Sequence, residues 1–289
     1  IDEGEDVKIE IASMPGYYRC SLDHTLSTVK ELWNMGLRAV LLFVKVKDEE
    51  KDNSGHAASN PDGLMQRSIK EIKNIFPEMI IMSDVALDPY SLYGHDGIVE
   101  GSEIINDETV YALVQMSLSH AACGADFVAP SDMMDGRVGA IREALEENGY
   151  SRTGIMSYSV KYASSFYGPF RDALESAPGF GDKKTYQMNT ANRIEALREV
   201  QLDVQEGADI VMVKPGLPYL DIVREVKNAV DVPVSVYNIS GEYAMIKAAA
   251  KMGWINEDKA ILETLTSMKR AGADLIATYF AKDAAKLLS

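Results

Sequence analysis

Gly154-Ile-Met-Ser-Tyr-Ser-Val-Lys161 and Ala208-Asp-Ile-Val-Met-Val-Lys214 are two largely hydrophobic runs that each end in a lysine. Runs of this length and composition predict strands that are buried on both faces, as in a parallel sheet. A lysine that continues such a strand requires a strand end that opens into a cleft, where its amine can act as a nucleophile. Two such amines in one cleft would lower each other's pKa, from an ordinary value near 10.4 to a working value of about 7.

Strand-like and helix-like segments alternate along the whole chain. Between the β-rich runs, apolar residues recur at helical spacing, for example at Ile194, Leu197, Val200 and Val204. This alternation is typical of a parallel sheet with crossover helices, and without a dinucleotide Gly-x-Gly-x-x-Gly turn it favours an α/β TIM (β/α)8 barrel over a doubly wound sheet. Seven runs predict strands, at residues 39–46, 79–87, 125–130, 154–160, 208–214, 232–239 and 273–280.

A short repeat supports the same architecture. Gly-Ala-Asp occurs at Gly124, Gly207 and Gly272, each time after a helical stretch and before a strand-like run. Glycine at that position is what the end of a helix favours, because it adopts the left-handed conformation without strain. We therefore expect residues 1–289 to form one barrel domain, of which the eighth strand is missing from the pattern.

The composition excludes several classes of function. A net charge of −15 opposes binding to nucleic acid or to an anionic membrane surface. Cys20 and Cys123 have no CxxC spacing and predict ordinary reduced thiols rather than a disulfide framework or a thiolate zinc site. No apolar run reaches the length of about 18 residues that a membrane span needs, and the acidic start is unlike a signal peptide, so we expect a cytoplasmic protein.

Around the two lysines the sequence resembles the porphobilinogen synthase family, also called 5-aminolevulinate dehydratase. The similarity runs from about residue 7 to the C-terminus. The matching motifs are MSYSVKYASSFYGPFRD at 156–172, VMVKPG at 211–216 with YLDI at 219–222, VYNISGEY at 236–243, ADFVAPS at 125–131 with MDG at 134–136, and DVALDPY at 84–90 with GHDG at 94–97. The resemblance implies a lyase that condenses two 5-aminolevulinate molecules to porphobilinogen with loss of two waters, an early step of tetrapyrrole (heme, chlorophyll, cobalamin) biosynthesis.

The resemblance also implies a role for both lysines. Each substrate carries a ketone, and a lysine Schiff base would activate it. Lys214 would hold the substrate that supplies the propionate side, and Lys161 the one that supplies the acetate side. The matching carboxylate-binding residues are Ser240 and Tyr279 for the first substrate, and Arg171, Lys183 and Gln187 for the second. Residues 175–184, rich in Gly and Pro, predict a mobile lid that carries Lys183 and Gln187 inward.

The metal prediction rests on three substitutions. Zinc-dependent members carry cysteines where this chain has Ala86, Asp88 and Asp96. Because zinc prefers thiolate or imidazole ligands, no catalytic zinc is expected. Together with Asp84, the two aspartates could hold a loosely bound divalent ion or form a proton relay. A purely structural role as turn and capping residues is an equal alternative.

A second ion is implied away from the active site, because members with an aspartate-rich segment are commonly stimulated by magnesium. Glu199 matches the position for this allosteric Mg²⁺, with Asp135 as an outer-shell partner, and one carboxylate plus waters suits magnesium. No organic cofactor is expected. The histidines His24, His56, His95 and His120 are too scattered to predict a ligand set, although His95 could help in proton transfer.

The assembly and two other functions remain open at this stage. Family members begin with an N-terminal arm and a first barrel strand upstream of the point where this sequence starts. We therefore expect a barrel that lacks both, which puts the usual homo-octamer in question because the arm wraps a neighbouring subunit. The alternative functions are a single-Schiff-base aldolase on the same barrel, and an inactive barrel that acts as an assembly module.

Overall fold

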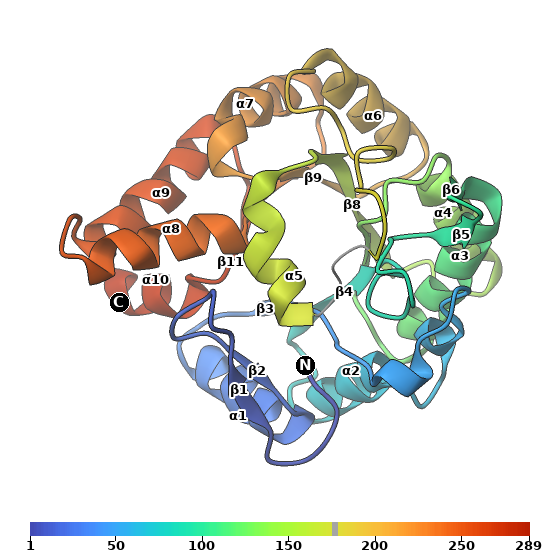
Figure 1. Ribbon diagram of the computed structural model, residues 1–289, viewed down its shortest axis with the longest axis horizontal. Helices are drawn as coiled ribbons and strands as arrows, with labels where there is room; N and C mark the ends of the chain where they lie inside the picture. Colours follow the sequence, from blue (N-terminus) through green and yellow to red (C-terminus); the bar gives the residue numbers. More distant parts are fainter. Residues whose placement is uncertain (175–178) are drawn as a thin grey trace.

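Seven parallel strands form one curved sheet, with helices packed around its outside (Figure 1). The computed structural model describes residues 1–174 and 179–289. The strand order is β11-β10-β9-β8-β7-β4-β3. These strands are β3 (Ala39–Leu42), β4 (Ile80–Val85), β7 (Phe127–Pro130), β8 (Gly154–Lys161), β9 (Ile210–Lys214), β10 (Val234–Asn238) and β11 (Leu275–Thr278). All seven predicted strands are thus confirmed, and the fold is a nearly closed TIM-type barrel.

The helices that cover the barrel follow the predicted alternation with the strands. The described α-helices are α1 (Leu22–Asn34), α2 (Leu64–Ile75), α3 (Asn106–Ala122), α4 (Arg137–Glu147), α5 (Gly168–Leu174), α6 (Ile194–Gln205), α7 (Leu220–Ala229), α8 (Ser240–Lys251), α9 (Glu257–Ala271) and α10 (Ala281–Leu288). Short 3-10 helices are η1 (Asp48–Glu50), η2 (His56–Ser59), η3 (Ser165–Tyr167) and η4 (Leu217–Tyr219). Within the part of the chain that the structure describes, no helix is both long and apolar enough to cross a membrane.

Two small antiparallel hairpins, which the sequence did not suggest, lie outside the barrel. They pair β1 (Lys8–Glu10) with β2 (Tyr18–Cys20), and β5 (Ile98–Glu100) with β6 (Glu103–Ile105). The barrel itself ends at β3 and β11, which do not pair with each other among the described residues. The first residues of the chain lie against the end of β3, where the N–H of Lys45 donates to the carbonyl of Ile1 at 2.8 Å.

The Gly-Ala-Asp repeat has a structural purpose. Each glycine ends its helix with a positive φ, and each aspartate that follows accepts a hydrogen bond from the backbone N–H near the start of the adjacent strand. Asp126 accepts from Ile81 at 2.7 Å, Asp209 from Ile155 at 2.8 Å and Asp274 from Val234 at 2.9 Å. The repeat therefore fixes the entry of neighbouring strands at the amino end of the barrel.

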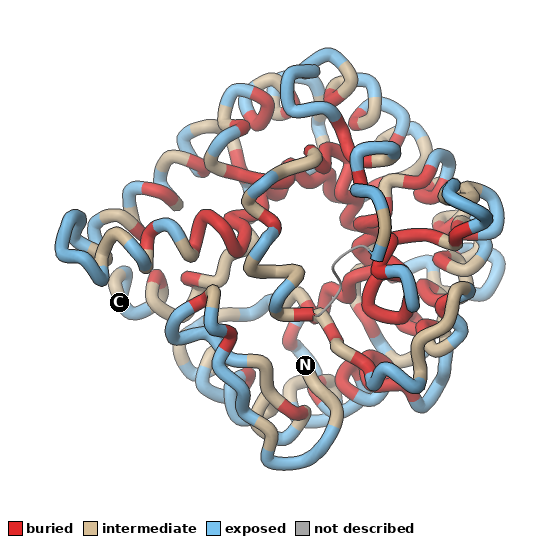
Figure 2. The backbone as a smooth tube through the Cα atoms, viewed as in Figure 1, coloured by how far each residue is buried: buried red, intermediate tan, exposed pale blue. Residues whose placement is uncertain are grey.

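Buried residues concentrate along the strands and on the sides of the helices that face them (Figure 2). Every residue of β9 and β10 is buried, as expected for parallel strands covered on both faces. Helix α5 lies across the opening of the barrel in Figure 1, at the carboxyl ends of the strands. Polar groups inside this covered opening are thus removed from water.

Candidate active site

The two lysines meet at the carboxyl ends of neighbouring strands. In the parallel pairing of β8 and β9, Lys161 lies directly opposite Lys214. Both side chains are buried, and both line one cavity, so the predicted common cleft is confirmed. We call it the lysine cavity, and its lining residues are Asp84, Asp88, Asp96, Ser131, Lys161, Tyr167, Phe170, Arg171, Lys183, Gln187 and Lys214.

This cavity is nearly filled by its own side chains. Its free volume is about 30 Å³, room for about two water molecules. Ion pairs between lysines and aspartates occupy the remaining interior. A substrate with a carboxylate of its own must therefore displace some of these contacts when it binds.

Asp96 links a strand-end lysine to the predicted lid. Its Oδ2 accepts from Nζ of Lys161 at 2.9 Å, and its Oδ1 accepts from Nζ of Lys183 at 2.6 Å. Burial alone would raise the pKa of Asp96, but the two ammonium groups outweigh it and hold that pKa far below the usual range. Lys161 also donates to the carbonyl of Ser131, and Lys183 lies 3.5 Å from Oδ2 of Asp88. Burial opposes the charge of Lys183, yet Asp88 and Asp96 raise its pKa.

Lys214 has a different environment from Lys161. No described residue accepts a hydrogen bond from its Nζ, and aromatic rings surround it instead. Burial, and then the positive charge of Lys161, lower the pKa of Lys214 to about 7. The lowered pKa agrees in direction with the expectation from the sequence for a lysine buried beside a second amine. At neutral pH a large fraction of Lys214 is a free amine, the form that attacks a carbonyl carbon.

Asp84, at the end of β4, is suited to carry protons. Burial, and then the charge of Asp88, raise its pKa to about 7. Ser131 donates to its side chain, while its Oδ1 has no hydrogen-bond partner among the described residues. A carboxyl with a pKa near the working pH can both give and accept a proton during a reaction.

Ser240 and Tyr279 lie behind the wall of the lysine cavity rather than in it. Oγ of Ser240 accepts from the N–H of Phe170 at 3.0 Å, and Tyr279 OH is 3.0 Å from Tyr237 OH. Phe170 and Tyr237 in turn present their rings to Nζ of Lys214. The structure thus places both residues on the Lys214 side, whereas Arg171, Lys183 and Gln187 line the cavity directly.

The predicted lid packs on the loop that carries Asp96. Residues 175–178 of the lid lie outside the described residues, but 179–184 are described. His95 is buried, with Nε2 at 3.1 Å from the carbonyl of Phe180 and Nδ1 at 3.0 Å from the hydroxyl of Tyr186. The same hydroxyl accepts from the N–H of Asp96 at 3.3 Å. His95 is absent from the cavity lining and both its nitrogens are engaged, so it holds the lid rather than facing the lysines.

Glu199 and Asp135 lie near each other, away from the lysine cavity. Burial, and then the charges of Asp203 and Asp135, raise the pKa of Glu199, and Arg137 partly offsets them. Arg137 is buried and is 3.5 Å from Asp203. The predicted magnesium position is therefore a region where carboxylates repel one another, which a cation would relieve.

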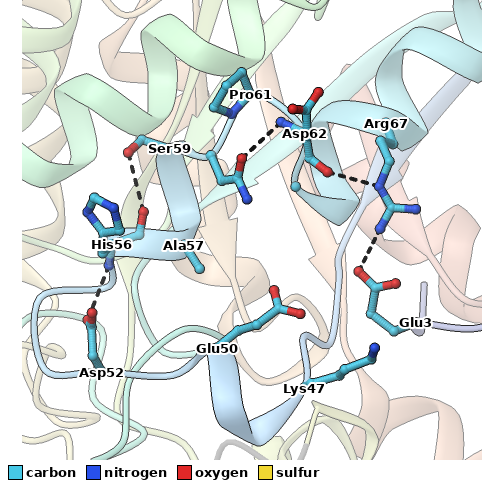
Figure 3. Close-up of a pocket in the computed structure, with 12 residues that line it drawn as sticks. Glu3, Lys47, Glu50, Asp52, His56, Ala57, Ser59, Pro61, Asp62 and Arg67 are labelled. Atoms are coloured by element: carbon cyan, nitrogen blue, oxygen red, sulfur yellow. Dashed lines mark hydrogen bonds and ion pairs between the residues drawn. The ribbon is translucent and has the colours of Figure 1, made fainter.

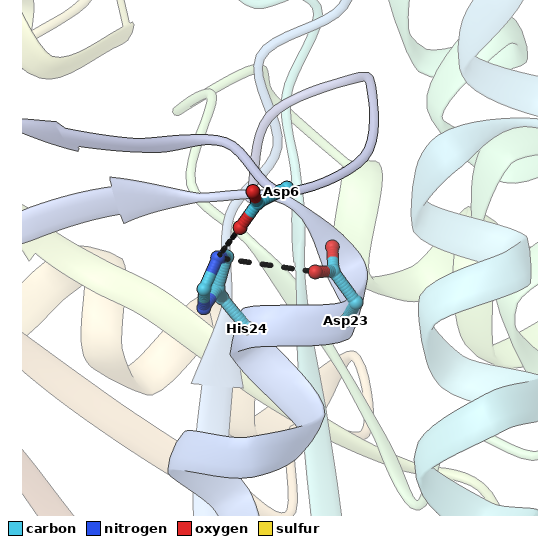
Figure 4. Close-up of side chains that lie close together, drawn as sticks. All are labelled: Asp6, Asp23 and His24. Atoms are coloured by element: carbon cyan, nitrogen blue, oxygen red, sulfur yellow. Dashed lines mark hydrogen bonds and ion pairs between the residues drawn. The ribbon is translucent and has the colours of Figure 1, made fainter.

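Two other polar groupings are separate from the lysines. A hollow of about 740 Å³ lies beside the loop after β3, and Figure 3 shows one ion pair across it, between Arg67 and Glu3 at 2.6 Å, with its other marked contacts made to backbone groups or neutral side chains. Asp6, Asp23 and His24 form the one group of described His, Cys, Asp or Glu side chains whose ligand atoms all lie within 4.8 Å (Figure 4). All three are on the outside of the barrel, and the predicted aspartates of the lysine cavity form no such group.

Sequence reasoning did not identify the aromatic residues near Lys214. Tyr158, Tyr167, Phe170 and Tyr237 lie within the motifs quoted for the lysines, but nothing in their spacing indicated that the rings converge. The carbonyl of Ser131, which accepts from Lys161, was missed for a similar reason. A backbone acceptor has no sequence signal, because every residue carries one.

A parallel barrel that buries three lysine amines and three carboxyl groups at one end, with two of the amines on neighbouring strand ends, is typical of enzymes that act on carbonyl compounds. The family model described as "Delta-aminolevulinic acid dehydratase" matches residues 1–287. The chain belongs to the delta-aminolevulinic acid dehydratase family, whose members are also named porphobilinogen synthase. It is thus a lyase of tetrapyrrole biosynthesis that condenses two molecules of 5-aminolevulinate to porphobilinogen.

Similar proteins support this assignment over nearly the full chain. The chain is 54% identical to the delta-aminolevulinic acid dehydratase of Bacillus subtilis, over 99% of this chain and 88% of that protein. It is 54% identical to the chloroplastic enzyme of Oryza sativa, over 100% of this chain and 68% of that protein. The crystal structure of the Toxoplasma gondii enzyme, in complex with the reaction product porphobilinogen, has a TM-score of 0.97 at 51% identity and covers 99% of this chain and 82% of that one.

Proposed function

We propose that Lys214 and Lys161 are the two amines that hold the two 5-aminolevulinate molecules during the condensation. The observation that carries this proposal is the register pairing of the two lysines inside one buried cavity. One bound substrate can then act as the nucleophile, through a carbon or its amine, and the other as the electrophile. Holding both in one site turns a reaction between two dissolved molecules into a reaction within one complex. A single-Schiff-base aldolase would not need the second buried amine. The similarity of the aldolase QR15, at 14% identity, is evidence for the fold alone.

The first step uses Lys214 as the free amine. Its lone pair adds to the ketone carbon, and the resulting alcohol leaves as water when a proton is supplied, which gives a protonated Schiff base. Asp84, with its pKa of about 7, is the carboxyl that can donate that proton and later accept one from the substrate carbon. Lys161 begins as an ion pair with Asp96 and must lose a proton before it attacks. We expect the carboxylate of the incoming substrate to bind Lys183, Arg171 and Gln187. In doing so it would draw Lys183 away from Asp96.

The carboxylate of the Lys214-bound substrate is assigned to Ser240 and Tyr279. Both residues are hydroxyl donors on the Lys214 side, behind Phe170 and Tyr237. The cavity must widen before a substrate can enter, because its free volume is smaller than a substrate molecule. The two sides of the cavity thereby differ in character, with neutral hydroxyls for one carboxylate and cations for the other.

The test of this assignment is chemical trapping. With 5-aminolevulinate present, borohydride should reduce a Schiff base to a stable amine, and peptide mass spectrometry should locate the adduct on Lys214, with a second on Lys161 at saturating substrate. Borohydride without substrate is the control and should leave both peptides unmodified. If Lys214 is unmodified during turnover, the assignment is wrong.

We also propose that Glu199 holds a magnesium ion, with Asp135 in its outer shell, and that this chain is of the aspartate-rich, magnesium-stimulated type. The mutual repulsion of Glu199, Asp203 and Asp135 supports the proposal, because it favours a bound cation. The ion would supply positive charge at this position and take no part in the reaction itself. In the lysine cavity Asp88 and Asp96 are already paired with lysines, whereas Asp84 has no ion pair within the described part of the chain and a raised pKa, which supports a proton relay through Asp84 over a bound ion there.

Glu199→Gln is expected to weaken magnesium binding at least about 10-fold, because it removes the one direct carboxylate ligand. Isothermal titration of the ion, which needs no turnover, measures the affinity, and activity with and without magnesium measures the stimulation. Glu147→Gln on α4, where the side chain is exposed, removes one charge elsewhere and should leave both unchanged. Equal magnesium affinity in the Glu199 variant and the native chain would contradict the proposed site.

Assembly and location remain predictions from the resemblance. We expect a homo-oligomer, in which large apolar side chains that are exposed in the single chain, such as Ile194, Trp254, Tyr111 and Met252, are available for burial in subunit interfaces. The family octamer is the expected form if the upstream arm is present. A cytoplasmic location is the corresponding expectation for the bacterial type, whereas several of the similar plant proteins are chloroplastic.

A further inference from the structure

Four aromatic rings surround the amine of Lys214, each from a different element. The distances from Nζ to the ring centroids are 5.0 Å for Tyr158 on β8, 5.4 Å for Tyr167 on η3, 5.1 Å for Phe170 on α5 and 4.7 Å for Tyr237 on β10. We call these four residues the aromatic cage. In each case Nζ lies over the ring, where the quadrupole of the ring is negative and attracts a cation.

The cage is held in place independently of Lys214's side chain. The hydroxyl of Tyr167 donates to the backbone carbonyl of Lys214 at 3.3 Å. Tyr237 is bonded to the hydroxyl of Tyr279, and the N–H of Phe170 donates to Ser240. Tyr158 is fully buried, and its ring meets that of Tyr237 edge to face at 6.4 Å. The rings are therefore positioned before any charge forms between them.

The proposed reaction requires the nitrogen of Lys214 to be neutral at first and positively charged later, and the aromatic cage suits both states. The nucleophile must be a neutral amine, yet the Schiff base that forms on the same nitrogen is a cation. A carboxylate in contact with Nζ would stabilise that cation, but it would equally hold the free amine as ammonium through a strong hydrogen bond. Ring faces attract a cation more weakly and accept no strong hydrogen bond.

We propose that the aromatic cage stabilises the protonated Schiff base on Lys214, so that Tyr158, Tyr167, Phe170 and Tyr237 are catalytic residues that contact the reacting nitrogen. This inference rests on the proposed role of Lys214. In the step concerned, the C–N bond forms, the ketone oxygen leaves as water with protons from the amine and a cavity acid, and the positive charge stays on nitrogen. The carboxylates of Asp84, Asp88 and Asp96 act on this charge from the other side of the cavity.

Phe170 allows the sharpest test because it has no hydroxyl group. Replacement by phenylalanines carrying one, two and three fluorines weakens the negative face of the ring while nearly preserving its shape. We expect kcat/KM and the rate of borohydride-trapped adduct formation on Lys214 to fall stepwise with each fluorine. A total decrease of about 2-fold to 30-fold corresponds to the energy of a cation–π contact.

The same fluorine series at Phe43 is the matched control. Its ring packs edge to face on Phe170 at 5.3 Å but does not face Nζ of Lys214, so both rates should stay unchanged there. If kcat/KM and the trapping rate fall equally in the Phe170 and Phe43 series, the cause is packing, and the proposed role of the aromatic cage is wrong. If the rates do not change across the Phe170 series while Lys214 is still trapped in the native chain, the proposed role of the cage is wrong and the assignment of Lys214 stands. If no adduct forms on Lys214 in the native chain, the assignment of this lysine is wrong, and so is the proposed role of the cage.

Discussion

Lys214→Ala is expected to lower kcat for porphobilinogen formation at least about 10⁴-fold, because it removes the nucleophile and the covalent hold on one substrate. Pyrrole formation measured with a colorimetric reagent gives the rate, and borohydride with substrate should no longer label this peptide. Lys251→Ala, an exposed lysine at the end of α8, is the control for loss of a lysine and should keep native activity. Substantial turnover by the Lys214 variant would contradict a covalent role for this residue.

The same amine predicts a pH dependence whose direction follows from its lowered pKa. Below pH 7 Lys214 is mostly ammonium and cannot attack, whereas above it the neutral form predominates. We therefore expect the rate of Lys214 adduct formation to rise with pH up to about 7 and to fall above it, because Asp84, the proposed proton donor for loss of water, is then mostly deprotonated. The exposed Lys259 provides a reference for reagent reactivity in the same digest. A rate that still climbs steeply above pH 9 would mean that burial does not lower this pKa.

The arrangement of strands was predictable, because it depends on periodicity within single segments. The runs that end in Lys161 and Lys214 gave two buried strands, and their placement at one end of the sheet followed from the parallel topology. The depressed pKa of Lys214 also followed from burial beside a second amine. The strands and their common end could be predicted because they need only the local sequence pattern and the rule that parallel strands end at the same edge of a sheet.

What the sequence could not provide was the arrangement of side chains across the barrel. The rings of Tyr158 and Tyr237 converge on Lys214 because β8 and β10 flank β9, and the depth of each ring depends on register and on packing by α5. His95 illustrates the same limit. Its neighbour Asp96 suggested a role in proton transfer, but its ring nitrogens contact the carbonyl of Phe180 in the lid and the hydroxyl of Tyr186 just after it. A side chain's direction is decided by tertiary contacts that adjacent residues do not encode.

The lysine cavity also explains why the two amines should not behave alike. Nζ of Lys161 donates to the carboxylate of Asp96 and to the backbone carbonyl of Ser131, so these contacts must change before it can attack. Lys214 faces rings and is free to attack first. On the proposed roles of the two lysines, we therefore expect the first 5-aminolevulinate to react at Lys214. The second would open the ion pairs of Asp96 and Lys183 with its own carboxylate.

Lys161→Ala separates this two-amine reaction from the aldolase alternative. We expect porphobilinogen formation to fall at least about 10³-fold, because the second substrate loses its covalent hold and its activation. The borohydride adduct on Lys214 should persist, since the first site keeps all its contacts. Thermal unfolding of the variant checks that Asp96, which retains Lys183 as a partner, does not destabilise the fold.

Lys161→Met is the matched variant, because it fills most of the volume of the lysine stem without an amine. If loss of the amine is the cause, both variants lose turnover to a similar degree and both keep the Lys214 adduct. Recovery of activity in the methionine variant alone would assign the effect to a cavity rather than to chemistry. Full activity in both variants would show that one Schiff base suffices, and the pairing of Lys161 with Asp96 would then serve only to hold Lys183 and the lid in place.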